Sequence, residues 1–351
     1  MYFASDNWAG VHPAVAQALA DAAAGYDPAY GNGAFDKRVA ARFNEIFERE
    51  VAVFFVATGT AANSLALASV AKPGGVSFCH REAHIFEDEC GAPEYLSGGA
   101  RLRPIDGALG KIDIERLKTE IERFPPDFVH AGQPAAISIT QATEIGTLYS
   151  LQEIEAIAAL ARQHGIALHM DGARFANALV TLDVSPAEMT WKRGVDMLSF
   201  GGTKNGCWCA EAVVLFEPSK AAEFAFYRKR GAQLFSKSRF IAAQFEAYFE
   251  DDLWLASARH ANAMAGKLAG TLASSSTIRL SWQPQANEVF AIMPRSVMAQ
   301  LTDAGAVFYE WHVPASFDGQ IGADEVLCRF VTSFATTDED VAGFARLITN
   351  R

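Results

Sequence analysis

Short apolar runs alternate with helical patterns over residues 51–216, and this alternation limits the fold more than any other feature of the sequence. Parallel strands need a crossover long enough to hold a helix, and such crossovers are right-handed. The alternation therefore predicts an α/β fold with a mostly parallel sheet and helices on both faces. The expected strands are 51–56, 76–79, 101–105, 135–140, 166–170, 197–200 and 212–216, with helices at 61–71, 112–123 and 151–164.

The pattern changes after about residue 219, where long helical stretches precede short strands. This order predicts a smaller α+β domain at the C-terminus. Its expected helices are 240–249, 253–272, 294–304 and 338–350, and its expected strands are 278–282, 288–293 and 326–330. We therefore divide the chain into an N-terminal segment (1–25), a large domain (26–240) and a small C-terminal domain (241–351).

Charge and cysteine content exclude several classes of protein. The formal net charge is −11, so the chain lacks the basic balance typical of nucleic-acid binding. Its five cysteines are scattered and form no paired Cys-x-x-Cys motif, which predicts reduced thiols, no metal site and a cytoplasmic location. Residues 51–71 carry no charge, but Thr58, Asn63 and Ser69 interrupt them. We expect a strand, a turn and a helix there, and no membrane span or signal peptide.

Lys204 lies in a glycine-rich turn, residues 199–206, directly after an expected strand. A lysine that binds a carbonyl cofactor covalently needs such a turn, because the cofactor must approach the backbone closely. Taken alone, this residue is better explained as an ordinary loop lysine.

Two further motifs also follow expected strands. Asp171, in residues 169–174, could pair with a protonated ring nitrogen, although a helix N-cap explains it equally well. Residues 58–63 join a strand to a helix, whose free amides and hydroxyls suit a phosphate group, although a capped turn has the same composition. They contain neither a nucleotide P-loop nor a dinucleotide-binding fingerprint. In a parallel sheet all three motifs meet beyond the carboxyl ends of the strands.

The motifs follow the order phosphate-binding turn, acid, lysine. This order resembles that of fold-type I enzymes, which depend on pyridoxal 5′-phosphate. The chain is similar over nearly its whole length to the L-threonine aldolase family of the β-eliminating lyase superfamily, from residues 5–7 to residues 329–332. The branch that includes L-phenylserine aldolase resembles it most, at residues 46–49, 186–192 and 331–337.

The resemblance implies a set of cofactor-binding residues. Lys204 corresponds to the lysine that forms the Schiff base, and Asp171 corresponds to the acid on the pyridine nitrogen. The remaining cofactor contacts fall on Gly59 and Thr60 at the phosphate, Arg174 near the ring hydroxyl and, from the basic residues Lys237 and Arg239, preferably Lys237.

The resemblance also implies a substrate site. His84 corresponds to a histidine that stacks on the cofactor ring, which makes it the third catalytic residue beside Lys204 and Asp171. Arg329 corresponds to the arginine that binds the substrate carboxylate, a task that suits its bidentate guanidinium. Ser5, Arg174 and Tyr30 complete the expected substrate contacts, and Tyr30 is expected to reach a neighbouring subunit. Residues 140–142, Thr-Gln-Ala, stand where many members have a second histidine, so the role of that histidine does not carry over.

The implied reaction is retro-aldol cleavage of L-threonine, L-allo-threonine or L-phenylserine to glycine and an aldehyde, with His84 or a water held by it as the base. A homodimer or homotetramer with the site at the subunit interface is implied by the resemblance alone. Three alternatives stay open. The same scaffold supports β-elimination or transamination. A non-catalytic binding protein is disfavoured by the intact site residues, and an NAD- or FAD-binding protein is disfavoured by the missing fingerprint.

Overall fold

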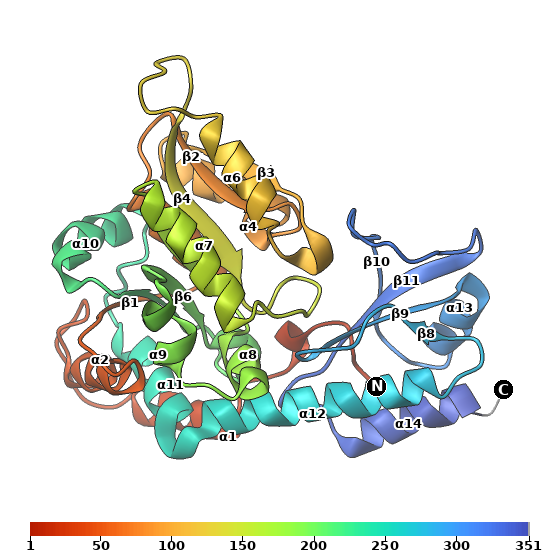
Figure 1. Ribbon diagram of the computed structural model, residues 1–351. Coiled ribbons are helices and arrows are strands. Elements are labelled where there is room, and N and C mark those ends of the chain that lie inside the picture. Colours follow the sequence, from red (N-terminus) through yellow and green to blue (C-terminus); the bar gives the residue numbers. More distant parts are fainter. Residues whose placement is uncertain (350–351) are drawn as a thin grey trace.

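The computed structural model describes residues 1–349 and contains two β-sheets, one in each of two domains (Figure 1). The large domain holds seven strands in the order β1-β7-β6-β5-β4-β2-β3. The neighbours from β3 to β6 pair in parallel, which confirms the predicted mostly parallel sheet. The strands are β1 (Ala52–Val56), β2 (Gly75–His80), β3 (Arg101–Ile105), β4 (Gln133–Thr140), β5 (Ala167–Gly172), β6 (Met197–Gly201) and β7 (Glu211–Leu215).

One expected strand, β7, runs against the rest of the sheet. It pairs antiparallel with both β6 and β1. The connection from Gly202 to Ala210 holds only one 3-10 turn, η4 (Thr203–Asn205), and no crossover helix. Because a parallel partner needs a longer crossover, this short connection can only return the chain antiparallel.

Helices cover both faces of the large sheet, as the sequence predicted. Successive side chains of β1 enter different cores: Phe55 joins the core under α2, α6, α7, α8 and α11, whereas Phe54 and Val56 join the core under α3 and α10. No helix within residues 1–349 is long and apolar enough to cross a bilayer. The helices of this domain are α1 (Pro13–Asp21), α2 (Ala34–Ile46), α3 (Gly59–Ala68), α4 (His84–Glu87), α5 (Ala92–Leu96), α6 (Ile114–Glu122), α7 (Leu151–Gln163), α8 (Phe175–Leu182), α9 (Pro186–Met189), α10 (Ala221–Arg230) and α11 (Arg239–Phe249).

Helix α7 shows how local sequence sets an element's ends. Ser150 and Glu153 form a reciprocal capping box at its start. Ile154 and Ile157 lie on its buried face. Gly165 follows its end with a φ of +66°, a conformation that favours glycine.

The small domain has a four-stranded antiparallel sheet in the order β10-β11-β9-β8. The edge strand β10 (Tyr309–Trp311) was not predicted, because three residues are too few to establish the period of a strand. The other strands are β8 (Arg279–Leu280), β9 (Glu288–Pro294) and β11 (Glu325–Val331), and the helices are α12 (Leu253–Ala273), α13 (Arg295–Asp303) and α14 (Asp338–Thr349).

The expected boundary after residue 240 falls inside α11. Phe249 of this helix packs edge-to-face against Phe43 in the core of the large domain. Helix α12 runs along both domains, with Trp254 in the large core and Leu268 in the small one (Figure 1). The N-terminal segment also joins the domains, because Phe3 lies in the small core while α1 packs on α11. Residues that follow Phe3 therefore pass between the domains.

Candidate active site

A cavity of about 250 Å³ lies where the three motifs meet, at the carboxyl ends of β5 and β6 and the start of α3. Ligands of parallel sheets bind at this edge. The lining residues are Asn7, Ala57, Thr58, Gly59, Thr60, Asn63, His84, Asp171, Ala173, Thr203, Lys204 and Glu211. The structure thus brings five of the predicted residues, Gly59, Thr60, His84, Asp171 and Lys204, into one cavity.

Lys204 follows β6 in the short turn η4 and is half-buried. Its amine forms no hydrogen bond or ion pair with any residue in 1–349, so it is free to react. The turn lies close to the β5–α8 connection because Gly201 has no side chain. A Cβ on Gly201 would lie 2.6 Å from the carbonyl oxygen of Ala173, which is too close for any other residue.

Asp171 ends β5 as a buried carboxylate that accepts two hydrogen bonds. Asn63 Nδ2 donates to Oδ2 at 2.8 Å, and the Ala173 amide donates to Oδ1 at 3.0 Å. Burial and the neighbouring Glu89 raise the pKa of Asp171, against the opposing charges of His84 and Lys204. Within the described chain no cation lies at ion-pair distance from this acid, so its negative charge can still pair with a positively charged ligand group.

The N-terminus of α3 offers free backbone donors at the same cavity. Thr58 caps the helix, and its hydroxyl accepts the Ala61 amide at 3.1 Å. The preceding amide of Ala57 donates to Gln233 Oε1 at 3.0 Å. The amides of Gly59 and Thr60 have no acceptor among residues 1–349. Free amides at a helix start bind phosphate, and a helix of ten residues contributes its dipole.

His84 is held by a buried acid that the sequence analysis did not identify. Its Nδ1 lies 3.0 Å from Glu89 Oε1, and the same oxygen accepts Asn63 Nδ2 at 2.9 Å. Asn63 also donates to Asp171, so a continuous chain of hydrogen bonds joins His84 to Asp171. The hydrogen bond to Glu89 raises the pKa of His84 above its usual value against burial, and the charge of Glu144 adds to this. The imidazole Nε2 has no partner in the described chain and is available to a ligand.

We expect the Glu89→Gln variant to shift the acidic limb of the pH profile of kcat/KM to lower pH by about one unit. A hydrogen bond to a charged group is worth about 1.5–3 kcal/mol, and 1.36 kcal/mol corresponds to one pKa unit. Loss of the anion lowers the pKa of His84, so the neutral, basic form persists at lower pH. The matched control is Glu87→Gln, which removes an exposed acid of α4, the helix that contains His84. If the acidic limb of the pH profile lies at the same pH in Glu89→Gln and in the wild type, the limb does not report the ionisation of His84.

A second group of charges lies beside the cavity, between the domains. Arg174 Nε and Nη2 donate to Asp6 at 2.8 and 3.1 Å, and its Nη1 lies 3.3 Å from Glu288 Oε2. Arg329 Nη1 lies 3.8 Å from the other oxygen of Glu288, and its guanidinium stacks on Trp311 with the carbon 3.8 Å from the ring centroid. The stacked guanidinium keeps unused donors, as a carboxylate-binding arginine requires.

The other predicted residues do not line the cavity, and they differ in whether they lie near the charged group of Arg174 and Arg329. Ser5 caps the 3-10 turn η1 (Asp6–Trp8), and the carbonyl before it, of Ala4, accepts Arg329 Nη2 at 3.5 Å. Arg174 lies in the ion-pair cluster and does not line the cavity. Tyr30 and Lys237 are exposed and outside the cavity lining.

Gln141, near the position of the second family histidine, is buried and structural. Its amide nitrogen donates to the carbonyl of Tyr149 at 3.0 Å, and its oxygen accepts the Tyr149 amide at 2.9 Å. Gln141 therefore secures the chain after β4 and has no free group for a ligand. The neighbouring Glu144 is half-buried, and its carboxylate forms no hydrogen bond or ion pair within residues 1–349.

Glu211 is another acid that the sequence analysis missed. It lines the cavity at the start of β7, and its Oε1 accepts the amide of Thr203 at 3.2 Å. Burial raises the pKa of Glu211 to about 7, although Thr203 and Lys204 oppose this. The missed residues of the region are Asp6, Asn7, Glu89, Glu144, Glu211 and Glu288.

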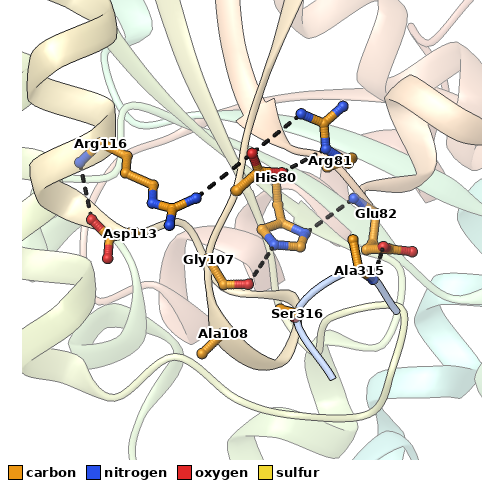
Figure 2. Close-up of a pocket in the computed structure, with 10 residues that line it drawn as sticks. His80, Arg81, Glu82, Gly107, Ala108, Asp113, Arg116, Ala315 and Ser316 are labelled. Carbon is orange, nitrogen blue, oxygen red and sulfur yellow. Dashed lines mark hydrogen bonds and ion pairs between the residues drawn. The ribbon is translucent and has the colours of Figure 1, made fainter. Parts of the chain in front are cut away.

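A larger hollow of about 630 Å³ lies between the large domain and the loop around Ala315 (Figure 2). Its charged groups are already paired: Arg81 and Arg116 both reach Asp106, at 2.5 and 3.7 Å, and His80 Nε2 lies 3.2 Å from a backbone carbonyl. It contains none of the predicted site residues. Nor do residues 1–349 contain a group of three His, Cys, Asp or Glu arranged to hold a metal ion. The smaller cavity is therefore the candidate active site.

The groups at this cavity fit pyridoxal 5′-phosphate. The cofactor needs an amine for its aldehyde, an anion for its protonated ring nitrogen and donors for its phosphate. Lys204 supplies an unpaired amine, Asp171 supplies a buried carboxylate without a cation, and the start of α3 supplies free amides.

Comparisons with known proteins agree with this fit. Residues 2–295 match the β-eliminating lyase family. The chain is 40% identical to a low specificity L-threonine aldolase of Pseudomonas aeruginosa over 98% of its own length and 96% of that protein, and 39% identical to a protein of the same name from another Pseudomonas strain, over 98% and 95%. It superposes on the structure of threonine aldolase from Leishmania major with a TM-score of 0.91 and 26% identity, covering 99% of this chain and 98% of the other. The chain therefore belongs to the β-eliminating lyase family and has the fold of fold-type I, pyridoxal-phosphate-dependent enzymes.

Proposed function

We propose that this protein is a pyridoxal-phosphate-dependent aldolase that cleaves L-β-hydroxy-α-amino acids to glycine and an aldehyde. The observation that carries the proposal is the cavity that combines Lys204, Asp171, His84 and the free amides of α3. The near-full-length similarity to the two Pseudomonas low specificity L-threonine aldolases supports this reaction over others of the same fold.

In this proposal the cofactor side of the site consists of four residues. Lys204 anchors the cofactor aldehyde, Asp171 pairs with the ring nitrogen, and the amides of Gly59 and Thr60 bind the phosphate. When bound, pyridoxal phosphate supplies the electron sink for cleavage of the Cα–Cβ bond. The hydrogen bonds from Asn63 and Ala173 keep the Asp171 carboxylate in a fixed orientation.

The substrate side consists of a cation and a base. Arg329 binds the α-carboxylate, with its guanidinium oriented by Trp311 and the carbonyl of Ala4. His84 accepts the proton of the β-hydroxyl at Nε2, while Glu89 fixes the ring and stabilises its protonated form. A positioned base contributes about 10²–10⁴-fold to the rate.

A product assay tests the proposed reaction. We expect equimolar glycine and acetaldehyde from L-threonine and L-allo-threonine, and benzaldehyde from L-phenylserine. The physical reason is that deprotonation of the β-hydroxyl breaks the Cα–Cβ bond and leaves the α-nitrogen on glycine. Release of pyruvate and ammonia from L-serine, without aldehyde from any of the three substrates, would instead assign a β-elimination.

The proposal includes a second copy of the chain at the site and a cytoplasmic location. Tyr30 has half of its surface exposed, and Lys237 is exposed outside the cavity, so neither contacts the site of its own chain. A neighbouring subunit in a homodimer or homotetramer could receive them. Large exposed aromatic side chains are typical of such interfaces.

A further inference from the structure

Glu288, the first residue of β9, is a fully buried acid between two arginines. Arg174 Nη1 lies 3.3 Å from one carboxylate oxygen, and Arg329 Nη1 lies 3.8 Å from the other. Neither contact is a hydrogen bond, and both oxygens lack a donor within residues 1–349. A buried carboxylate without hydrogen bonds is costly, so this acid is poorly satisfied where it lies.

Asp6 in the same cluster differs from Glu288. It accepts two hydrogen bonds from Arg174 and a third, at 3.1 Å, from Asn287 Nδ2. Burial alone would raise the pKa of Asp6, but the charges of Arg174 and Lys204, with these hydrogen bonds, lower it. Asp6 is therefore the permanent partner of Arg174, and Glu288 is the remaining counter-charge of Arg329.

The charges around Glu288 come from four elements. Arg174 at the start of α8 and Arg329 of β11 are positive, and Asp6 of η1 and Glu144 in the turn after β4 are negative. Gly146 allows that turn to lie close to β9, because a Cβ at this position would be only 3.0 Å from Glu288 Cβ. The two arginines already face the two buried carboxylates of Asp6 and Glu288. A substrate carboxylate at Arg329 therefore adds an uncompensated negative charge next to Glu288.

We propose that Glu288 competes with the substrate carboxylate for Arg329 and takes up one proton from solvent when an amino acid binds. The carboxylate of Glu288 becomes a neutral carboxylic acid, and the guanidinium of Arg329 then pairs with the substrate alone. This inference rests on the proposed role of Arg329 as the carboxylate-binding residue. It makes substrate affinity depend on pH through a residue that does not take part in bond cleavage.

The direction of the pH dependence follows from the charges. Burial raises the pKa of Glu288 to about 7; Arg174 and Arg329 oppose this, whereas Glu144 and Asp6 add to it. A bound carboxylate raises it further, because it adds negative charge and weakens the attraction of Arg329. Below about pH 6 the acid is already neutral, so binding takes up no proton through it. Above about pH 7 binding takes up one proton through Glu288, and this uptake by itself lowers the affinity about tenfold for each further pH unit.

Calorimetric titration of the holoenzyme with glycine tests the proposal. Titrations at about pH 6 and pH 8.5, each in two buffers of different ionisation enthalpy, give the protons taken up per glycine. We expect the wild type to take up about one more proton than Glu288→Gln at pH 8.5, and the same number at pH 6. The amino group of glycine loses the same proton in both proteins, so their difference isolates Glu288. Glycine should also bind Glu288→Gln about 10–30-fold more tightly than the wild type at pH 8.5.

Two further variants complete the experiment. Glu310→Gln removes an exposed acid of the neighbouring strand β10 that pairs with Arg295, and it should titrate like the wild type. Glu288→Met, neutral and of similar length, should behave like Glu288→Gln and serves if the glutamine variant does not fold.

The possible outcomes separate this inference from the proposed function. Equal proton uptake by the wild type and the neutral variants at pH 8.5 overturns the role of Glu288. Aldehyde release from L-threonine is measured on the same preparations. If aldehyde is absent while the difference in proton uptake is present, the aldolase function fails and the role of Glu288 stands.

Discussion

The Lys204→Ala variant is expected to lose the visible absorbance of lysine-bound pyridoxal phosphate and to lose activity by about 10³-fold or more. Lys204 is the one lysine that lines the cavity, and its amine has no competing partner in the described chain. Removing it leaves the cofactor bound only through Asp171 and the start of α3. The measurements are the absorbance spectrum and the rate of aldehyde release, each at saturating cofactor.

Lys220→Ala is the matched control, because Lys220 is an exposed lysine of the same domain whose charge pairs with Glu217. It should keep both absorbance and activity. The thermal stability of Lys204→Ala should stay close to that of the wild type, since Lys204 is only half-buried. A Lys204→Ala protein that is still yellow, and that borohydride reduces to a covalent adduct, would place the cofactor on another lysine.

Much of the fold was predictable because the signals are local. The apolar runs and their breaking glycines predicted every strand of the large sheet within one or two residues, and the capping box at Ser150 marks the start of α7. The antiparallel direction of β7 was missed, although the short connection through Lys204 contained the necessary information. The edge strand β10 has too few residues to show a period.

The arrangement of the proposed cofactor side of the site was predictable for a related reason. Lys204, Asp171 and Gly59 each follow a strand, and a parallel sheet brings such positions to one edge. Two residues that hydrogen-bond within the site, Asn63 and Glu89, gave only weak signals in the sequence. Asn63 lies one helical turn after Gly59, and Glu89 lies five residues after His84. Spacing alone did not distinguish these residues from ordinary helix or loop positions.

The proposed substrate side was less predictable because it depends on contacts between residues that are distant in sequence. Arg174 was expected near the cofactor ring. Its ion pairs with Asp6 and Glu288 were not predicted, because both acids are far from it in the sequence. One segment from the N-terminus, one from the large domain and one from the small domain meet at this place. No pattern within a single segment indicates that they do. Glu288 is on a strand that the sequence predicted, yet its burial against Arg329 follows only from domain packing.

We expect Asp171 to have opposite effects on stability and on function, which makes its replacement informative. Burial and Glu89 raise the pKa of this acid, so its ionised form is disfavoured in the folded protein without a cationic partner. A group whose folded pKa is raised stabilises the fold only at low pH and destabilises it where it is ionised. A protonated ring nitrogen beside it removes this disadvantage, because the two charges then form a buried pair.

We therefore expect Asp171→Asn to lower kcat by about 10²–10⁴-fold while the cofactor-free protein melts at the same or a higher temperature. Breaking a buried ion pair costs about 3–5 kcal/mol, and each 1.36 kcal/mol corresponds to a factor of ten in rate. In the wild type, Asn63 Oδ1 is buried without a hydrogen-bond partner. If Asn63 turns its side chain, this oxygen can accept a hydrogen bond from the side-chain amide introduced by Asp171→Asn. The rise in melting temperature on adding pyridoxal phosphate should be smaller in Asp171→Asn than in the wild type. The control is Asp196→Asn, which should keep the full rise. Asp196 is an exposed acid at the other end of β5 from Asp171. Equal cofactor-induced stabilisation of the wild type and Asp171→Asn would rule out the pairing of Asp171 with the ring nitrogen.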